Sequence, residues 1–254
     1  MTRDRGWLIQ QYDSVASTMD QARLLTVFGA PDRTVVVSAE QTAGRGRGGR
    51  SWQSPAGTAV FCTMVLRPAV TPDRLSTLPL VAGVAVAEAI ELVTGCAVQL
   101  KWPNDVWLGA DPDNAKVAGI LVTSSLRGNA VDHALVGIGI NVLAKPEDLP
   151  PGATSVSAAT GLVATPDQVF NVLLDRFEDA YADYVAAEGR PSLDGWRARA
   201  ALVGESVIVQ DADRQLAGTF AGIDEDGGLL IEEPGRPIRK VVAGNLVRGP
   251  RSIR

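Results

Sequence analysis

In "TVVVSAEQTAGRGRGGRSW", residues Thr34–Trp52, a strand pattern changes into a loop pattern. The first half is a β-branched run, which predicts a strand over Thr34–Gln41. The second half places three arginines among four glycines, with no acidic residue between them. Glycine lets a backbone approach a ligand closely, and guanidinium groups fit phosphate or carboxylate oxygens. We therefore expect this loop to bind an anionic ligand, because its arginines have no partner within it.

Two other interpretations of this segment, the Gly/Arg loop Thr42–Trp52, stay open on its residues alone. It is either a basic surface turn in solvent or an RGG-type RNA-binding segment. The RNA-binding interpretation is disfavoured because the unit occurs once, between two strands, in a chain with a net charge of -5. The spacing matches neither the phosphate loop GxxxxGK(S/T) nor the dinucleotide fingerprint.

Outward from this loop, strands and helices are mixed, which predicts an α+β fold with a central sheet flanked by helices. Pro166 follows the capping residue Thr165 at the start of an amphipathic helix, and Gly95 closes a long apolar one. The predicted strands are Trp7–Val15, Thr34–Gln41, Gly57–Pro68, two short strands around Pro103 in "AVQLKWPNDVWL", and the pair "AKVAGILVTSSL" and "DHALVGIGINVL". The predicted helices run from Ser17 or Thr18 to Gly29, over Leu75–Gly95, over Thr165–Ala187, and over "SLDGWRARA".

The sequence changes character after about Leu202. Four or five short strand patterns follow, separated by the turn signals "DADR", "DEDGG" and "EPGR". This spacing predicts a small antiparallel barrel. We therefore divide the chain into residues 1–201, which hold the motifs, and residues 202–254. A further acidic segment, "GADPDNA" at 109–115, is predicted to be a hairpin turn, since it lacks the ligand pattern of a calcium loop.

The composition indicates a folded, soluble protein. The chain has 254 residues, of which 46% are hydrophobic. Its acidic balance argues against a general binder of nucleic acid or anionic membranes. Cys62 and Cys96 are expected to be reduced, and His133 is expected to have no catalytic role. The start has no signal-peptide pattern, and Glu88 and Glu91 interrupt the most apolar stretch, so we expect a cytoplasmic protein.

Three further motifs carry polar residues at strand ends or glycines within strands. They are "KWPNDVW" (Lys101–Trp107), "KVAGIL" (Lys116–Leu121) and "GIGIN" (Gly137–Asn141). Taken singly, each has a purely structural interpretation: an ordinary turn, a solvated lysine, or a buried strand against close-packed backbone.

Taken in order with "EQTAGRGRGGRSW", these motifs resemble the biotin protein ligases, closely over Tyr12–Asn141 and loosely beyond. The resemblance implies a mixed sheet like that of class II aminoacyl-tRNA synthetases, with a C-terminal SH3-like barrel. It also implies ATP-dependent transfer of biotin to one lysine of a biotin carboxyl carrier protein through biotinyl-5′-AMP, with Mg²⁺ on the ATP phosphates. The alternative on the same scaffold is a lipoate or octanoate ligase or transferase.

The resemblance also assigns site residues and partners. Arg45, Arg47 and Lys116 would be the catalytic cations, and Asp105 would position a metal or the acceptor lysine. The family often has Asn after Ser-Thr, where Met19 stands here. The biotin pocket would contain Ser17, Thr18, Gln41, Gly44, Arg45, Lys116, Gly119 and Gly137. The side that binds ATP and the adenylate would contain Arg47, Arg50, Trp52, Asn104, Asp105 and Asn141. The expected partner is a carrier domain of a biotin-dependent carboxylase, and no nucleic acid or membrane is expected to bind. The protein itself is expected to be a monomer or a homodimer.

Two rival functions from other classes are disfavoured. Some ligases of this kind are also DNA-binding repressors with an additional N-terminal domain, but the first strand here begins at Trp7. An adaptor built on the C-terminal barrel would leave the polar motifs before residue 142 without a role.

Overall fold

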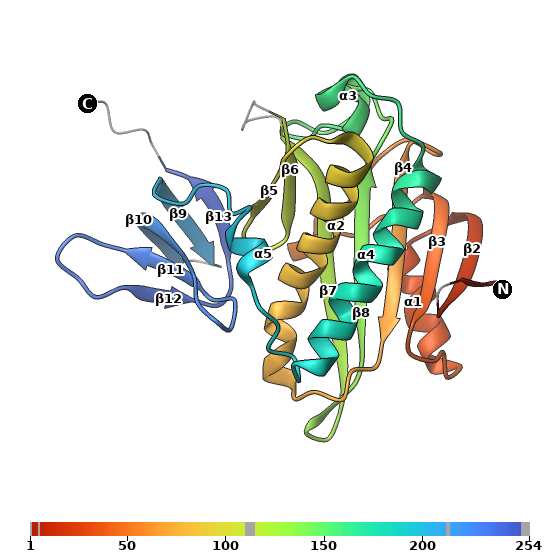
Figure 1. The fold of residues 1–254 in the computed structure, drawn as a ribbon, viewed down its shortest axis with the longest axis horizontal. Coiled ribbons are helices and arrows are strands. Elements are labelled where there is room, and N and C mark those ends of the chain that lie inside the picture. The colour runs from red at the N-terminus through yellow and green to blue at the C-terminus, as the bar shows by residue number, and fades with distance from the viewer. Residues whose placement is uncertain (1, 5, 110–114, 212–213, 250–254) are drawn as a thin grey trace.

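The computed structural model describes residues 2–4, 6–109, 115–211 and 214–249. Most of the acidic turn predicted at 109–115, and the middle of the "DADR" turn, lie outside these residues. The larger part of the chain is a mixed sheet of eight strands flanked by helices, as predicted (Figure 1).

The large sheet has the strand order β1-β2-β3-β4-β8-β7-β6-β5. Strands β2 and β3 run parallel, and all other neighbours are antiparallel. The long hairpin of β7 and β8 supplies the centre of the sheet, and β8 also pairs with β4. The strands are β1 (Thr2–Asp4), β2 (Trp7–Val15), β3 (Thr34–Gln41), β4 (Ala59–Leu66), β5 (Val98–Lys101), β6 (Asp105–Leu108), β7 (Lys116–Arg127) and β8 (Ala130–Asn141).

Helices cover both faces of this sheet. Helix α2 (Leu78–Thr94) and helix α4 (Pro166–Ala186) pack together on one face (Figure 1). Helix α1 (Thr18–Val27) packs on the other face, where its buried residues contact Val36 and Val65. Successive residues of a strand point to opposite faces, and the neighbouring Val35 and Met64 belong to the main core on the α2 side. The two remaining helices are short, α3 (Val156–Thr160) and α5 (Asp194–Arg197).

The two long helices begin and end where the sequence predicts. The Thr165 side chain accepts from the Gln168 amide, and the Gln168 side chain accepts in return from Thr165, so α4 begins with a capping box. Helix α2 ends at Gly95, which adopts a φ of 70°. The segment Pro72–Thr94 is long and apolar enough to cross a membrane, but 61% of its most apolar window is buried within the protein, as in a core helix.

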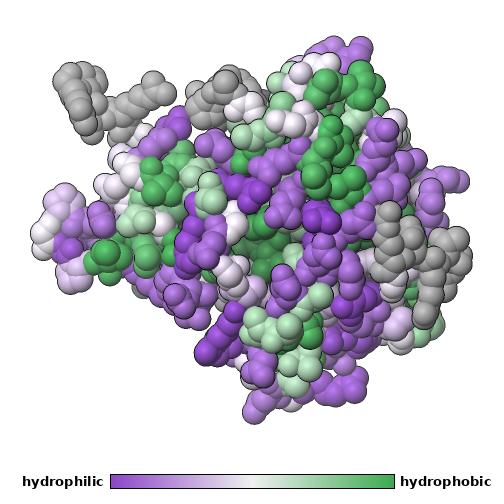
Figure 2. All heavy atoms as spheres, viewed as in Figure 1, coloured by the Kyte–Doolittle hydropathy of each residue, from purple (hydrophilic) through white to green (hydrophobic). Residues whose placement is uncertain are grey.

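The C-terminal part is an antiparallel sheet of five strands in the order β12-β11-β10-β9-β13, which confirms the predicted run of short strands. Its apolar side chains, including Phe220 and Ile231, belong to the same buried cluster as the residues of α2. Figure 2 shows that the surface on the α2 and α4 side is largely polar, with separate apolar patches near α3 and over this C-terminal sheet. The strands are β9 (Ser206–Asp211), β10 (Arg214–Ile223), β11 (Leu229–Glu232), β12 (Arg239–Val241) and β13 (Asn245–Arg248).

The two cysteines are free, as expected, and they differ in reactivity. Burial raises the pKa of the Cys62 thiol to about 12, whereas Cys96 is partly exposed. We therefore expect Ellman's reagent at pH 8 to titrate Cys96 alone in the native protein and both thiols after denaturation, because only the thiolate reacts. Rapid reaction of Cys62 in the native protein, identified by peptide mass mapping, would contradict the described burial.

Candidate active site

A cavity of about 320 Å³ lies between the Gly/Arg loop, the start of α1 and the strands β7 and β8. Twelve of the predicted site residues line it: Ser17, Thr18, Gln41, Arg45, Arg47, Arg50, Trp52, Asn104, Lys116, Gly119, Gly137 and Asn141. Of the predicted set, Gly44 and Asp105 do not line the cavity, but each contacts a residue that does. The cavity falls in the size range of small-ligand sites.

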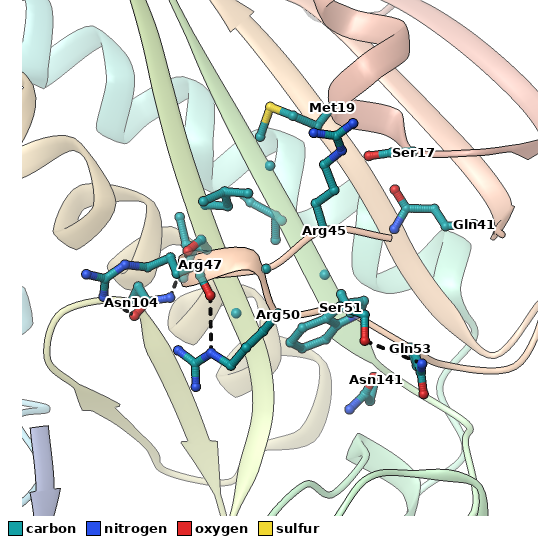
Figure 3. A pocket seen from close by; sticks show the side chains of 18 of the residues that line it. Ser17, Met19, Gln41, Arg45, Arg47, Arg50, Ser51, Gln53, Asn104 and Asn141 are labelled. Atoms are coloured by element: carbon teal, nitrogen blue, oxygen red, sulfur yellow. Dashed lines mark hydrogen bonds between the residues drawn. The ribbon is translucent and has the colours of Figure 1, made fainter. Parts of the chain in front are cut away.

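The cavity is elongated along β8. Gly137, Gly139 and Asn141 alternate along this strand, so they share one face and span roughly 13 Å at the rise of an extended chain. In Figure 3, Ser17, Met19 and Gln41 lie toward one end of the pocket, and Gln53 and Asn141 lie toward the other. This shape suits a ligand with two different ends joined by a linker.

The Gly/Arg loop folds into a small hairpin over the cavity. The Trp52 amide donates to the Gly44 carbonyl at 3.0 Å, and the Gly46 amide donates to the Arg50 carbonyl at 2.7 Å. Its tip, Arg47–Gly49, is a short 3-10 turn, and Gly48 and Gly49 adopt φ angles of 64° and 75°. The glycines thus allow a turn that other residues rarely adopt.

Arg45 has no acidic partner within the loop, as expected, but it is paired with a residue outside the loop. Its guanidinium forms an ion pair with Asp20 of α1 at 2.8 Å. In Figure 3, the Arg45 side chain extends toward Met19 and Ser17, whereas Arg47 points toward Asn104. Asp20 was missed because it precedes the loop by more than twenty residues and approaches it only in the folded chain.

Arg47 is held by the motif "KWPND" and by the C-terminal sheet. Its Nη1 donates to Asn104 Oδ1 at 2.9 Å, and its Nη2 donates to the Gly244 carbonyl at 3.3 Å. Asn104 in turn donates from Nδ2 to the Ile120 carbonyl at 2.9 Å, so the motif is attached to β7. Burial lowers the pKa of the Arg47 guanidinium, and the charge of Asp105 partly offsets this effect.

One end of the cavity is built from hydroxyl and amide groups. Gln41 Oε1 accepts from the Thr18 amide at 2.7 Å and from Thr18 Oγ1 at 3.0 Å, and Thr63 Oγ1 donates to Thr18 Oγ1 at 2.9 Å. This leaves the Gln41 amide nitrogen available to donate to a ligand. Met19 is buried beside this network and accepts from the Thr123 hydroxyl through its sulfur at 3.7 Å.

The middle of the cavity floor consists of glycines under the Trp52 indole. A Cβ on Gly139 would lie 2.5 Å from Trp52 Cε2, and a Cβ on Gly119 would lie 2.8 Å from Trp52 Cζ3. Only glycine therefore lets the ring lie flat on the strands. Gly139 belongs to the "GIGIN" motif, of which only Gly137 and Asn141 are predicted site residues.

Gly139→Ala is expected to displace Trp52 and to weaken ligand binding while the chain stays folded. The clash is with a rigid ring, so relief costs about 1–3 kcal/mol, equivalent to a rise in KM of about fivefold to 150-fold. Gly83→Ala is the control, because its Cβ would meet only Leu100 at an ordinary 3.6 Å. Equal KM values for Gly139→Ala and the wild type would contradict the described packing.

Lys116 is the cation beside the glycine floor. Its ammonium lies 2.6 Å from Asp105 Oδ1 and 5.5 Å from the centre of the Trp52 ring. Lys101 approaches the other Asp105 oxygen at 3.5 Å, and burial lowers the pKa of Lys101. Asp105 thus bridges two ammonium groups at the edge of the cavity, which fixes the position of Lys116.

Two buried polar atoms at the cavity have no hydrogen-bond partner among the described residues. They are the Trp52 indole nitrogen, a donor, and Asn141 Oδ1, an acceptor. Asn141 is 2% exposed, and its Nδ2 donates to the Thr154 carbonyl at 3.0 Å. Buried polar groups are nearly always paired, so these atoms indicate where a ligand would complete the site.

One wall of the cavity is formed by a loop that no sequence motif predicts to be part of the site. Residues 150–153 line it, held to the start of β7 because the Lys116 amide donates to the Gly152 carbonyl at 3.1 Å. The Thr154 amide donates back to the Lys116 carbonyl at 2.9 Å. A loop that follows β8 is thus placed beside Lys116 by backbone pairing that no local pattern encodes.

Comparison with known proteins gives the family. The model of the Biotin/lipoate A/B protein ligase family matches residues 13–141, and that of the Biotin protein ligase C terminal domain matches residues 202–246. The bifunctional ligase/repressor BirA of Bacillus subtilis is 34% identical over 98% of this chain and 76% of its own length. The biotin–(acetyl-CoA-carboxylase) ligase of Paracoccus denitrificans is 39% identical over 78% of this chain and 84% of its own.

A solved structure supports the same assignment. Biotin protein ligase from Aquifex aeolicus, in complex with biotin and ATP, superposes with a TM-score of 0.81 at 28% identity, over 95% of this chain and 99% of the other. The fold and the pocket define an α+β ligase with an elongated, cation-lined site. The chain belongs to the biotin/lipoate A/B protein ligase family, which confirms the resemblance of its motifs to biotin protein ligases.

Proposed function

We propose that this ligase activates biotin with ATP and transfers it to a lysine of a biotin carboxyl carrier domain. The observation that carries the proposal is the order of groups along the cavity. A hydroxyl and amide end suits a polar ring, a glycine floor with Lys116 suits a carboxylate next to a phosphate, and Asn141 supplies a free acceptor at the far end.

The roles of the residues follow from this order. Ser17, Thr18 and Gln41 bind the ureido ring, and Gly137 lets the ring approach β8. Lys116, Arg45 and Arg47 stabilise the carboxylate and the α-phosphate. At the far end, the unpaired Oδ1 of Asn141 accepts a hydrogen bond from the adenine amino group, and the Trp52 indole shields the anhydride from water. Because Met19 has no amide, the ring loses one polar contact that an asparagine there would make.

The reaction proceeds in two substitutions. A carboxylate oxygen of biotin attacks the α-phosphorus of ATP, and the bond to the departing pyrophosphate breaks. The amine of the acceptor lysine then attacks the acyl carbon, AMP leaves, and the amine loses a proton. Both reactants of the first step are anionic, so fixed guanidinium and ammonium groups lower its barrier by positioning and charge stabilisation. The mixed anhydride must be kept from water until the lysine arrives, which is the role of the loop.

Magnesium fits this site only as an ion carried by the nucleotide. Among the described residues, no carboxylate lines the cavity, and both oxygens of the nearby Asp105 are engaged by lysines. Magnesium commonly binds through substrate phosphates with few protein ligands. We therefore infer that ATP phosphates supply its ligands, and that the ion offsets charge on the departing pyrophosphate.

Exchange of pyrophosphate into ATP, measured with each acid in turn, shows whether the enzyme activates biotin, lipoate or octanoate. We expect exchange that depends on biotin and is not supported by lipoate or octanoate, because the hydroxyl and amide end pairs with a ureido ring and not with an alkyl chain. Exchange driven by lipoate or octanoate at a similar or higher rate would favour the alternative ligase on the same scaffold.

We also propose what the protein acts on and where it acts. The acceptor is a carrier domain of a biotin-dependent carboxylase, and neither nucleic acid nor a membrane takes part. The protein acts in the cytoplasm as a monomer or homodimer. The division into residues 1–201 and 202–254 also remains a prediction.

A further inference from the structure

Trp102 of the "KWPND" motif has no role in the site as described so far. Its side chain is 2% exposed, and its indole Nε1 donates to the Gly227 carbonyl at 3.0 Å. Gly227 lies in the turn between β10 and β11, so this bond joins the motif to the C-terminal sheet.

A second hydrogen bond to the C-terminal sheet comes from Arg47, which is itself bound to Asn104 of the motif. Asn104 accepts from Arg47 Nη1, and Arg47 Nη2 donates to the Gly244 carbonyl, in the turn between β12 and β13. The motif and the loop arginine are thus tied to two backbone carbonyls of the C-terminal sheet. Trp102, Asn104, Arg47 and Gly227 all line a second cavity, of about 660 Å³, that adjoins the first.

Both carbonyls are held in place by close packing of their turns. A Cβ on Gly227 would lie 2.7 Å from Leu80 Cδ1, where the turn meets α2. A Cβ on Gly244 would lie 2.9 Å from Val209 Cγ1 and 3.0 Å from the Gln210 carbonyl oxygen. The φ angles of 79° and 137° also favour glycine at these positions. The two acceptors therefore lie in closely packed turns.

We propose that Trp102 is a positioning residue for adenylate formation, through which the C-terminal sheet fixes Arg47. The Gly227 carbonyl orients Trp102, Asn104 two residues further on is thereby held against β7, and Asn104 orients the Arg47 guanidinium toward the α-phosphate. This inference rests on the proposed function. It gives the C-terminal sheet a part in the first half-reaction, before any carrier domain binds.

The test is Trp102→Phe, which keeps an aromatic side chain in the core but removes the indole donor. Trp7→Phe is the matched control, because Trp7 is equally buried and its indole nitrogen has no hydrogen-bond partner among the described residues. Both variants lose similar packing, and Trp102→Phe also loses a hydrogen bond, so both are expected to melt at a lower temperature, Trp102→Phe at the lower of the two. Initial rates of biotin-dependent pyrophosphate exchange are compared at equal concentrations of folded protein.

We expect Trp102→Phe to lower kcat about tenfold, because the motif loses its hydrogen bond to the Gly227 carbonyl and Arg47 is no longer held in place. Its KM for biotin is expected to stay at the wild-type value, because the ring-binding end is remote from the motif. Trp7→Phe is expected to keep the wild-type kcat.

A second pair of variants tests the other carbonyl. Gly244→Ala must displace its turn, because the new Cβ would meet Val209 and Gln210. Gly222→Ala is the control, because Gly222 has a φ of 126°, close to the 137° of Gly244, and no atom within 4 Å of the new Cβ. We expect only Gly244→Ala to lower kcat. Wild-type kcat in both Trp102→Phe and Gly244→Ala, or equal loss in the test variants and their controls, would overturn this inference alone. Absence of biotin-dependent exchange in the wild type would overturn the proposed function, and this inference with it.

Discussion

Lys116→Met is expected to reduce biotin-dependent pyrophosphate exchange about a hundredfold while the chain stays folded. The ammonium lies beside the glycine floor, where charge develops as the carboxylate attacks the α-phosphate. One well-placed cation is worth about 3 kcal/mol in such a transition state. Methionine keeps most of the length and removes the charge. Initial exchange rates and melting curves of the same preparations provide the measurement.

Lys145→Met is the matched control for this variant. Lys145 is exposed in the turn after β8 and does not line the cavity, so its loss is expected to leave the exchange rate unchanged. Wild-type exchange in Lys116→Met would show that the ammonium does not act on the reacting groups.

Arg47→Ala is expected to have the second large effect, on both formation and retention of the intermediate. The guanidinium is partly buried and already fixed by Asn104 and the Gly244 carbonyl, so it requires little reorganisation to bind a phosphate. We expect exchange to fall by about a hundredfold, the lower end of the range for loss of one fixed donor. We also expect more biotinyl-AMP in solution per turnover, because the loop loses its contact with Asn104 and closes less tightly.

The free intermediate can be measured by chromatography after a single turnover. Arg236→Ala serves as control, because that arginine is 66% exposed in the turn between β11 and β12 and pairs only with Glu233 among the described residues. If Arg47→Ala formed and retained the intermediate like the wild type, the loop arginine would have no part in closing the site.

The sequence was sufficient to predict most elements of the fold. The β-branched run of β3, the capping box of α4 and the glycine that ends α2 are local signals, and each has the predicted structure. The motif order also brought most site residues to one cavity, because β7 and β8 are neighbours in the chain and pair along their length. Local pattern and near-neighbour pairing therefore determine this part of the site.

The remaining parts depend on contacts between distant segments. Asp20 reaches Arg45 from another element, and residues 150–153 reach Lys116 through backbone pairing alone. The flat packing of Trp52 on Gly139 depends on how the loop folds back over the sheet. The bonds from the C-terminal sheet to Trp102 and Arg47 join residues more than a hundred positions apart. None of these contacts leaves a periodic or local signal in the sequence.

Incubation of the protein with ATP, Mg²⁺, biotin and a purified biotin carboxyl carrier domain tests the central claim most directly. Intact-mass and peptide analysis should find the mass of one biotinyl group on one lysine of the carrier, and none when ATP is omitted or that lysine is replaced by arginine. A carrier that stays unmodified with biotin, while a lipoate-accepting domain is modified with lipoate or octanoate under the same conditions, would contradict the account.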